Sequence, residues 1–249
     1  MEHGGAARAS GSRPIAPEHA YVFDPAASIS CGFDISSIDV VAAVQQSNLV
    51  MGSLPLSLYR TIDLKTQSGV VGAIFASELA SRVGAIPNPI EKGHPDIVPP
   101  AALGATEAQL RNYPDGLEIK STLGTVATGS ALGAGEARIN VLKTVVWQAH
   151  HRDVRSLMGL LWDFVEGTKT ELRHPVITAV FYTDRLEEDD WGAIAGTTGR
   201  NTKVTAMKVS GRRKMGEGAI AVLDAPKYPV EYARCLGIRE FTSLSARST

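Results

Sequence analysis

One continuous apolar run, from Pro175 to Tyr182, constrains the fold of this chain more than any other stretch. It shows no alternation between apolar and polar positions, so the strand that it predicts must be covered on both faces. Such a strand belongs inside a sheet that has other layers packed on each side. Together with the helical patterns below, it predicts an α/β fold: a central mixed β-sheet flanked by helices.

Three segments have the pattern of helices that could cover such a sheet. Between Gly69 and Val83, apolar residues recur every three or four positions and form one stripe. Ser36 and Ser37 precede an apolar segment in the manner of a capped helix start. Val154 to Glu166 has a similar apolar stripe and is followed by Gly167, a common stop signal. We therefore expect helices at all three places.

Three short strands are expected before the apolar run. Prolines and glycines frame a strand from His94 to Val98. Apolar and polar residues alternate from Leu117 to Thr122, and Val141 to Ala149 contains a β-branched run. Residues 101–116 are expected to form a polar connection with at most one short helix. The resulting order of helix, strand, strand, strand and helix covers the core, about residues 69–183.

Composition sets the limits of the domain. With 249 residues, 44% of them apolar and 20% charged, the chain has the composition of an ordinary globular protein. We expect a flexible tail over residues 1–20, which hold little to bury, and a single domain over 21–249. The sequence has no apolar run of membrane-spanning length and no signal-peptide core. Because Cys31 and Cys235 are isolated, a reducing cytoplasm is the expected location.

The residues that carry chemistry are Asp96, Glu118 and Lys120. Alternate residues of a strand point to the same side, so Glu118 and Lys120 share one face while Ile119 takes the other. If the strand that starts near Asp96 lies beside this one, Asp96 supplies a second carboxylate. Two carboxylates and a backbone carbonyl, most simply that of Ile119, form a hard oxygen site suited to Mg²⁺.

A divalent metal in such a site favours phosphodiester hydrolysis. The metal polarises a phosphate and lowers the pKa of a bound water. Lys120 can orient that water or stabilise the charge that develops on the phosphate in the transition state. The three residues therefore predict a metal-dependent hydrolase that acts on phosphate esters.

Pro95-Asp96, followed by Glu118-Ile119-Lys120, resembles the P-D…(D/E)-x-K signature of the restriction-endonuclease-like nuclease superfamily, PD-(D/E)xK. The resemblance implies an endonuclease that hydrolyses DNA with Mg²⁺, or with Mn²⁺ in its place. The chain length and the plain motif are most like those of a type II restriction endonuclease, which implies a homodimer that cuts double-stranded DNA at a short site. The resemblance also suggests a role for Glu78, because several of these enzymes use a glutamate from the helix before the Pro-Asp strand.

Two of these assignments have alternatives. Glu78 falls near the middle of the apolar stripe of residues 69–83, where a carboxylate must be paired, protonated or bound to metal. An ion pair with Arg82, four residues on, accounts for it as well as a metal does. The motif itself has a second, weaker match in Asp63-Leu64-Lys65, which lacks a preceding Pro-Asp. Glu118 and Lys120 could also be a surface pair on an edge strand.

The sequence offers one candidate surface for a phosphate backbone. Net charge is −1, so any such surface must be local. Val204 to Val209 and Ala219 to Leu223 are expected to pair as strands around a basic loop, Ser210 to Lys214, within a C-terminal β extension of about residues 196–225. A merely soluble hairpin is the alternative. The predicted DNA-binding residues are Arg200, Lys203, Lys208, Arg212, Arg213 and Lys214.

Other segments and function classes stay open. The acidic stretch Asp184 to Asp190 is expected to be a solvated loop. Gly124 to Gly135 is expected to be a flexible loop that either closes on substrate or only connects strands. A repair or recombination nuclease of the same superfamily, with structure-selective substrates, is the first rival function. A non-catalytic DNA-binding protein with an accidental motif is the second.

Overall fold

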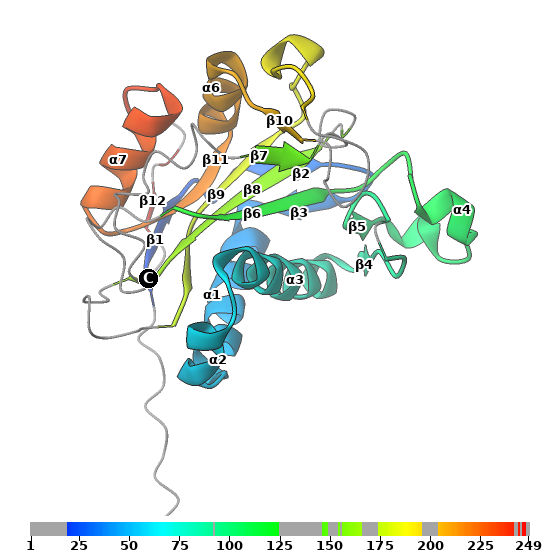
Figure 1. Ribbon diagram of the computed structural model, residues 1–249, viewed down its shortest axis with the longest axis horizontal. Coiled ribbons are helices and arrows are strands. Elements are labelled where there is room, and N and C mark those ends of the chain that lie inside the picture. Colours follow the sequence, from blue (N-terminus) through cyan, green and yellow to red (C-terminus); the bar gives the residue numbers. More distant parts are fainter. Residues whose placement is uncertain are drawn as a thin grey trace, which may run out of the picture.

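A six-stranded β-sheet forms the centre of the protein (Figure 1). The computed structural model describes residues 19–91, 93–124, 146–148, 154, 156–165, 174–195, 204–241, 244 and 246–247. The sheet has the strand order β12-β1-β11-β9-β8-β6, in which β6 and β8 are parallel and the other neighbours antiparallel. The predicted α/β fold with a central mixed sheet is confirmed. The strands are β1 (Tyr21–Phe23), β6 (Glu118–Leu123), β8 (Leu157–Asp163), β9 (Val176–Thr183), β11 (Ala219–Leu223) and β12 (Ala246–Arg247).

Helices cover both faces of this sheet (Figure 1). On one face lie α1 (Ser37–Ser53) and α3 (Leu64–Val83), joined by α2 (Leu56–Thr61). On the other lie α6 (Val209–Glu217) and α7 (Lys227–Leu236). All eight residues of β9 are buried between these layers. The prediction that the apolar run forms a strand covered on both faces is therefore confirmed.

The predicted helices in the first half of the chain are present. Ser36 caps α1, and its hydroxyl accepts a hydrogen bond from the backbone N–H of Asp39. Helix α3 includes the predicted 69–83 stripe but begins earlier, because the Asp63 carboxylate accepts hydrogen bonds from the N–H groups of Lys65 and Thr66. The second acid-x-Lys match is thus a helix cap, and its residues do not lie on a strand.

The predicted helix at Val154 to Glu166 is wrong, because β8 occupies that segment. The segment is apolar at nearly every position, so it matches a helical stripe and a buried strand equally well. In the fold it lies between β6 and β9, which supply the backbone hydrogen bonds on both of its sides. Met215 of α6 packs so closely on Gly159 that an added Cβ would lie 2.9 Å from its terminal carbon. Burial on both faces therefore selects the strand.

The predicted hairpin between residues 204 and 223 is also wrong. Residues 209–217 form α6, while β11 pairs with β9 and β1 in the main sheet. The strand β10 (Val204–Ala206) pairs instead with β7 (Val146–Gln148), which lies within the predicted third strand, Val141 to Ala149. The expected C-terminal β extension does not form, because its second strand belongs to the central sheet.

The remaining elements are short. A hairpin of β2 and β3 precedes α1, and β4 and β5 follow α3, before a connection that contains a 3₁₀ turn and α4. The predicted tail up to residue 18 and the Gly124 to Gly135 loop beyond Gly124 lie outside the described residues. The short elements are β2 (Ser28–Ser30), β3 (Asp34–Ser36), β4 (Ile86–Pro87), β5 (Ile97–Val98), η1 (Pro100–Ala102), α4 (Glu107–Leu110) and η4 (Glu188–Asp190).

Within the described part of the chain, none of the helices combines the length and the apolar character needed to cross a membrane. Cys31 and Cys235 are both buried free thiols.

Candidate active site

Two carboxylates face each other where β5 meets the start of β6. Ile97 and Leu117 exchange two backbone hydrogen bonds, of 3.0 and 2.9 Å, as an antiparallel pair does. One step along this pairing, Asp96 stands opposite Glu118. Side chains directly opposite in an antiparallel pair point to the same face, with Cβ atoms about 4.5–5.5 Å apart. The Asp96 segment therefore lies beside the Glu118 strand. Of the predicted strand from His94 to Val98, however, only Ile97–Val98 forms a strand, and it pairs with β4 outside the central sheet.

The backbone of Ile119 also takes part in this arrangement. Its N–H donates a hydrogen bond of 2.7 Å to Oδ2 of Asp96. The N–H of the preceding residue, Glu118, donates in the opposite direction, to the carbonyl of Ser156. Because the N–H and C=O of one strand residue point to the same side, the Ile119 carbonyl faces the side on which Asp96 lies. The predicted carbonyl ligand therefore lies beside the carboxylate pair.

His94 also belongs to this cluster, although no motif in the sequence gives it a role. Its Nδ1 lies 3.2 Å from Oε2 of Glu118. That hydrogen bond is the main cause of the raised pKa of His94. The backbone on either side of the ring is held by the loop before β6: the His94 N–H donates to Arg111 and the His94 carbonyl accepts from Tyr113. The sequence contained a signal for this role: His94 lies two residues before Asp96, and alternate residues of a strand share a face.

Lys120 lies on the same face of β6 as Glu118. In the parallel pairing Lys120 stands beside Gly159, and an added Cβ at Gly159 would point toward α6. The side chains of Glu118 and Lys120 therefore project to the α6 and α7 side of the sheet. Burial lowers the pKa of Lys120, and the charge of Lys65 lowers it further. Lys65 lies in the first turn of α3. A second positive charge, which the sequence did not indicate, therefore stands near Lys120.

The carboxylate pair suits a divalent cation. Burial, followed by the charge of Glu118, raises the pKa of Asp96 to about 7. A cation between the two groups would relieve this repulsion, and oxygen ligands are those that Mg²⁺ prefers. Among the described residues, no three His, Cys, Asp or Glu side chains form a complete metal-binding group. Mg²⁺ in proteins usually keeps several non-protein ligands. The protein would supply two carboxylates and the Ile119 carbonyl, and waters and a phosphate oxygen would complete the coordination.

The raised pKa predicts how stability depends on pH without metal. Folding raises the pKa of Asp96 above its ordinary 3.8, to about 7, so the folded state holds this proton more tightly. The contribution of Asp96 to stability is then fully present below about pH 4 and is lost as pH rises toward 7, by about 1 kcal/mol per pH unit. His94, whose pKa is also raised, acts in the same direction near its own titration.

Urea unfolding at pH 5 and pH 7 in the presence of chelator would measure this effect. Asp96→Asn should lose clearly less stability between the two pH values than the wild type. Equal losses in the two proteins would show that Asp96 is not the group responsible.

Gly116 permits the close approach of β5 and β6. Its φ is +135°, and a Cβ there would overlap the carbonyl oxygen of Ile97 and lie 2.5 Å from Cγ of Pro95. We expect Gly116→Ala to destabilise the fold by about 2–3 kcal/mol and to reduce activity, because β5 must move away from Glu118. Gly104→Ala is the matched control: φ is +94° but open space surrounds the position, so its cost should be about 1 kcal/mol. Equal melting temperatures of the two variants would contradict this role of Gly116.

Glu78 is not brought into the carboxylate pair. It lies half-buried on α3, which packs on the face of the sheet that carries Ser121. Glu118 and Lys120 project to the opposite face. A metal role for Glu78 therefore depends on the family resemblance alone, and its ion pair with Arg82 stays a prediction.

The predicted DNA-binding residues are not on a basic loop. Arg212, Arg213 and Lys214 lie on α6, and Arg200 and Lys203 are outside the described residues. Two of these basic side chains form ion pairs: Lys214 Nζ lies 2.8 Å from the buried Asp190 carboxylate, and Arg213 lies 3.9 Å from Glu217. The expectation that residues 184–190 form only a solvated loop is therefore wrong for Asp190, which is buried and paired with Lys214.

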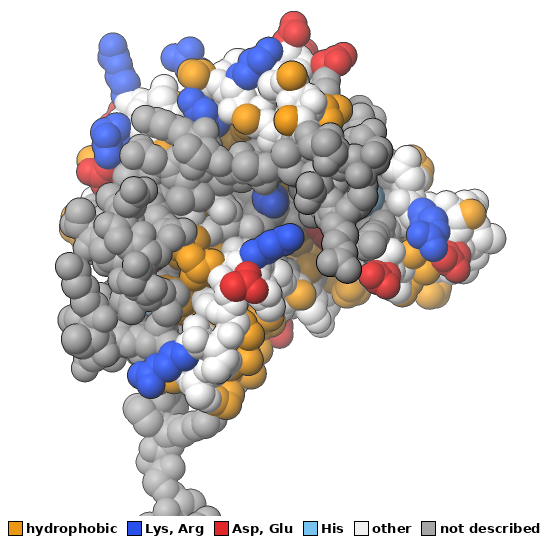
Figure 2. Space-filling view, in the orientation of Figure 1, with side chains coloured by type: hydrophobic (Ala, Val, Ile, Leu, Met, Phe, Trp, Pro, Cys, Tyr) orange, Lys and Arg blue, Asp and Glu red, His pale blue; other side chains and the backbone are white. Residues whose placement is uncertain are grey.

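Some positive charge nevertheless remains on the surface of this helical layer. The side chains of Lys208 and Arg213 are exposed. Figure 2 shows Lys and Arg side chains gathered over α6 and α7, with a few acidic side chains beside them. This layer covers the same face of the sheet to which Glu118 and Lys120 point. It remains the candidate surface for a phosphate backbone.

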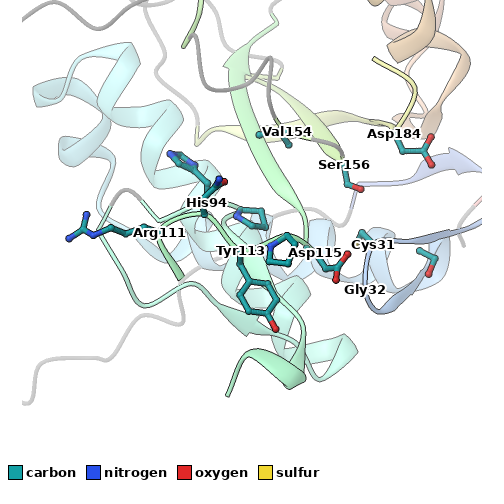
Figure 3. A pocket seen from close by; sticks show the side chains of 14 residues that line it. Cys31, Gly32, His94, Arg111, Tyr113, Asp115, Val154, Ser156 and Asp184 are labelled. Carbon is teal, nitrogen blue, oxygen red and sulfur yellow. The ribbon is translucent and has the colours of Figure 1, made fainter. Parts of the chain in front are cut away.

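A pocket of about 670 Å³, whose lining side chains are drawn in Figure 3, adjoins the carboxylate pair through His94. His94 and Ser156, which contact Glu118 through a side chain and a backbone carbonyl, are both in its wall. The end of β2 and the turn after it, the loop before β6, Val154 before β8 and the residue after β9 supply the rest. The lining residues are Ser30, Cys31, Gly32, His94, Pro95, Arg111, Asn112, Tyr113, Pro114, Asp115, Gly116, Val154, Ser156 and Asp184.

Comparison with known proteins yields no relative: no family model, curated protein or solved structure matches this chain. The interpretation of the site therefore depends on its own residues and their geometry.

Proposed function

We propose that this protein is a metal-dependent endonuclease that hydrolyses phosphodiester bonds in DNA. The observation that carries the proposal is the placement of Asp96 opposite Glu118, with Lys120 on the same face of β6. Two strands that are separate in the sequence meet there to form one acidic site with one lysine. A surface Glu-Lys pair on an edge strand would account neither for the second carboxylate nor for the burial of Glu118, which is 2% exposed.

Each residue has a chemical task in this proposal. Asp96, Glu118 and the Ile119 carbonyl would hold Mg²⁺, or Mn²⁺ in its place. When bound, the metal supplies Lewis-acid activation of the phosphate and of a water molecule. Lys120, whose pKa is lowered by burial, orients the attacking water or stabilises the negative charge that develops on the phosphate. His94 positions the Glu118 carboxylate through its Nδ1 contact of 3.2 Å.

The form of nuclease that we propose is a type II restriction endonuclease acting on double-stranded DNA as a homodimer. The chain length and the plain motif support it. A two-fold dimer would place two active sites on opposite strands of a symmetric target. A repair or recombination nuclease is the second candidate, and the polar pocket beside the carboxylate pair favours it, because a pocket of this kind suits an irregular substrate.

Incubation of plasmid DNA with the protein and Mg²⁺ tests the proposal. Discrete fragments are expected from a site-specific endonuclease. Cutting limited to junctions, flaps or unpaired regions would favour the repair-type alternative. DNA that is bound but stays intact, with either Mg²⁺ or Mn²⁺, would overturn the enzymatic proposal in favour of a DNA-binding protein.

A further inference from the structure

The pocket beside the carboxylate pair has the size and position of a site for one nucleotide. A sphere of about 670 Å³ is roughly 11 Å across, and pockets of about 300–1,000 Å³ are those that hold small organic ligands. The major groove alone of B-DNA is about 12 Å wide. A double helix therefore cannot enter this pocket, whereas a single nucleotide fits within it.

The pocket adjoins the proposed site of chemistry through two of its lining residues. His94 belongs to its wall and lies 3.2 Å from Oε2 of Glu118. Ser156, on the opposite side, accepts the backbone hydrogen bond of Glu118 at 3.0 Å. A nucleotide in the pocket would thus place its own phosphate, or the next one along the strand, near Asp96 and Glu118.

The charges around the pocket are asymmetric. In Figure 3 the carboxylates of Asp115 and Asp184 lie on the side of Cys31 and Gly32, and His94 and Arg111 lie on the other side. Arg111 also pairs with Glu107. Carboxylates repel phosphate but accept hydrogen bonds from the exocyclic amino groups of bases, as Asp and Glu do with the N4 amino group of cytosine. The acidic side therefore suits a base, and the basic side suits the sugar-phosphate backbone.

The turn after β2 holds this acidic side in place. Gly32 has φ of +91°, and a Cβ there would lie 2.8 Å from Cβ of Asp115. The absence of a side chain at Gly32 lets Asp115 approach the turn from the loop before β6. The wall is thus built from segments that are distant in sequence and packed closely against each other.

We propose that this pocket takes one unpaired or flipped-out nucleotide of a DNA strand, with a base that carries an exocyclic amino group. The proposal rests on the nuclease function proposed above and specifies its substrate. Extruding a base from a duplex costs a few kcal/mol, and least where the base is already unpaired. DNA with a single unpaired nucleotide should therefore bind more tightly than the same duplex without it.

The test compares the binding of two fluorescent duplexes in Ca²⁺, one fully paired and one with a single bulged 2-aminopurine. We expect the wild-type protein to bind the bulged duplex at least tenfold more tightly, with a change in 2-aminopurine emission. Ser30→Trp, which fills the pocket from an exposed position of β2, should abolish both effects. Ser28→Trp is the matched control, because Ser28 is also exposed on β2, two residues away, but does not line the pocket.

A second variant tests the chemistry of the pocket without filling it. Wild type should prefer a bulged cytosine over a bulged thymine, because thymine has no amino group. Asp184→Ala should reduce this preference, whereas Ser28→Trp, which lies outside the pocket, should keep it. This measurement decides the question if Ser30→Trp does not fold.

The outcomes separate the two proposals. Cleavage of plasmid DNA combined with equal affinity for bulged and paired duplexes would overturn the pocket assignment and leave the nuclease proposal intact. A bulge preference that Ser30→Trp removes, in a protein that cuts no DNA, would overturn the nuclease proposal and support the pocket. An equal loss in Ser30→Trp and Ser28→Trp would count against the pocket assignment.

Discussion

Asp96→Asn, Glu118→Gln and Lys120→Ala should each lower the rate of DNA cleavage by about 10²–10³-fold or more. The two carboxylates stand opposite each other across β5 and β6, and Lys120 shares their face, so each variant removes one part of a single unit. Residues that act as a unit give losses that do not add, so a double variant should be little worse than the single ones. Single-turnover cleavage of a labelled duplex measures the effect, and circular dichroism checks the fold.

Asp63→Ala is the matched control for these variants. Asp63 belongs to the other acid-x-Lys match, but its carboxylate caps α3. The substitution should cost about 1 kcal/mol of stability through the lost cap and leave the cleavage rate of the folded protein near that of wild type. Undiminished turnover in folded Lys120→Ala protein would refute the catalytic unit.

Divalent metal should control both activity and stability. Mg²⁺ or Mn²⁺ should support cutting and excess chelator should abolish it, while Ca²⁺, which is larger and less strict in geometry, should allow binding with little cleavage. Independently of activity, saturating Mg²⁺ should raise the melting temperature by a few degrees, because it binds the folded state and relieves the repulsion that raises the pKa of Asp96.

The melting experiment has its own controls. Asp96→Asn should show little metal-induced shift. Glu217→Gln, which changes an exposed glutamate at the end of α6, should keep the full shift. Full cleavage activity in excess chelator, or an unaltered shift in Asp96→Asn, would exclude a metal at this pair.

Local sequence was sufficient where one pattern excluded the others. The run that became β9 is too short and too rich in β-branched residues for a helix, and it has no polar face. Ser36 and Asp63 carry the side-chain oxygens that begin α1 and α3. The alternation from Leu117 to Thr122 is a property of the strand itself, so the shared face of Glu118 and Lys120 could be predicted without knowledge of the neighbouring strands.

Long-range packing decided what local pattern left open. Residues 157–163 suit a helix or a buried strand, and only the open hydrogen-bonding edges of β6 and β9 make them a strand. Ser210-Gly211 suits a turn, yet Gly211 lies within α6, where an added Cβ would be 2.7 Å from Met207 and 3.1 Å from Asp190. Gly211 there serves close packing, which no pattern along the chain reveals.

In the candidate site, too, some features follow from the sequence and others only from the tertiary structure. The sequence alone determined which residue types could perform the chemistry and which two of them share a strand face, because side-chain direction in a strand follows from backbone geometry. Only the tertiary structure decided that Asp96 stands opposite Glu118, that His94 contacts it, that Glu78 lies across the sheet, and that Lys214 pairs with Asp190. Each of these depends on contacts between segments distant in the chain, and such contacts form only when the buried faces of β5, β6, β8 and α6 pack together.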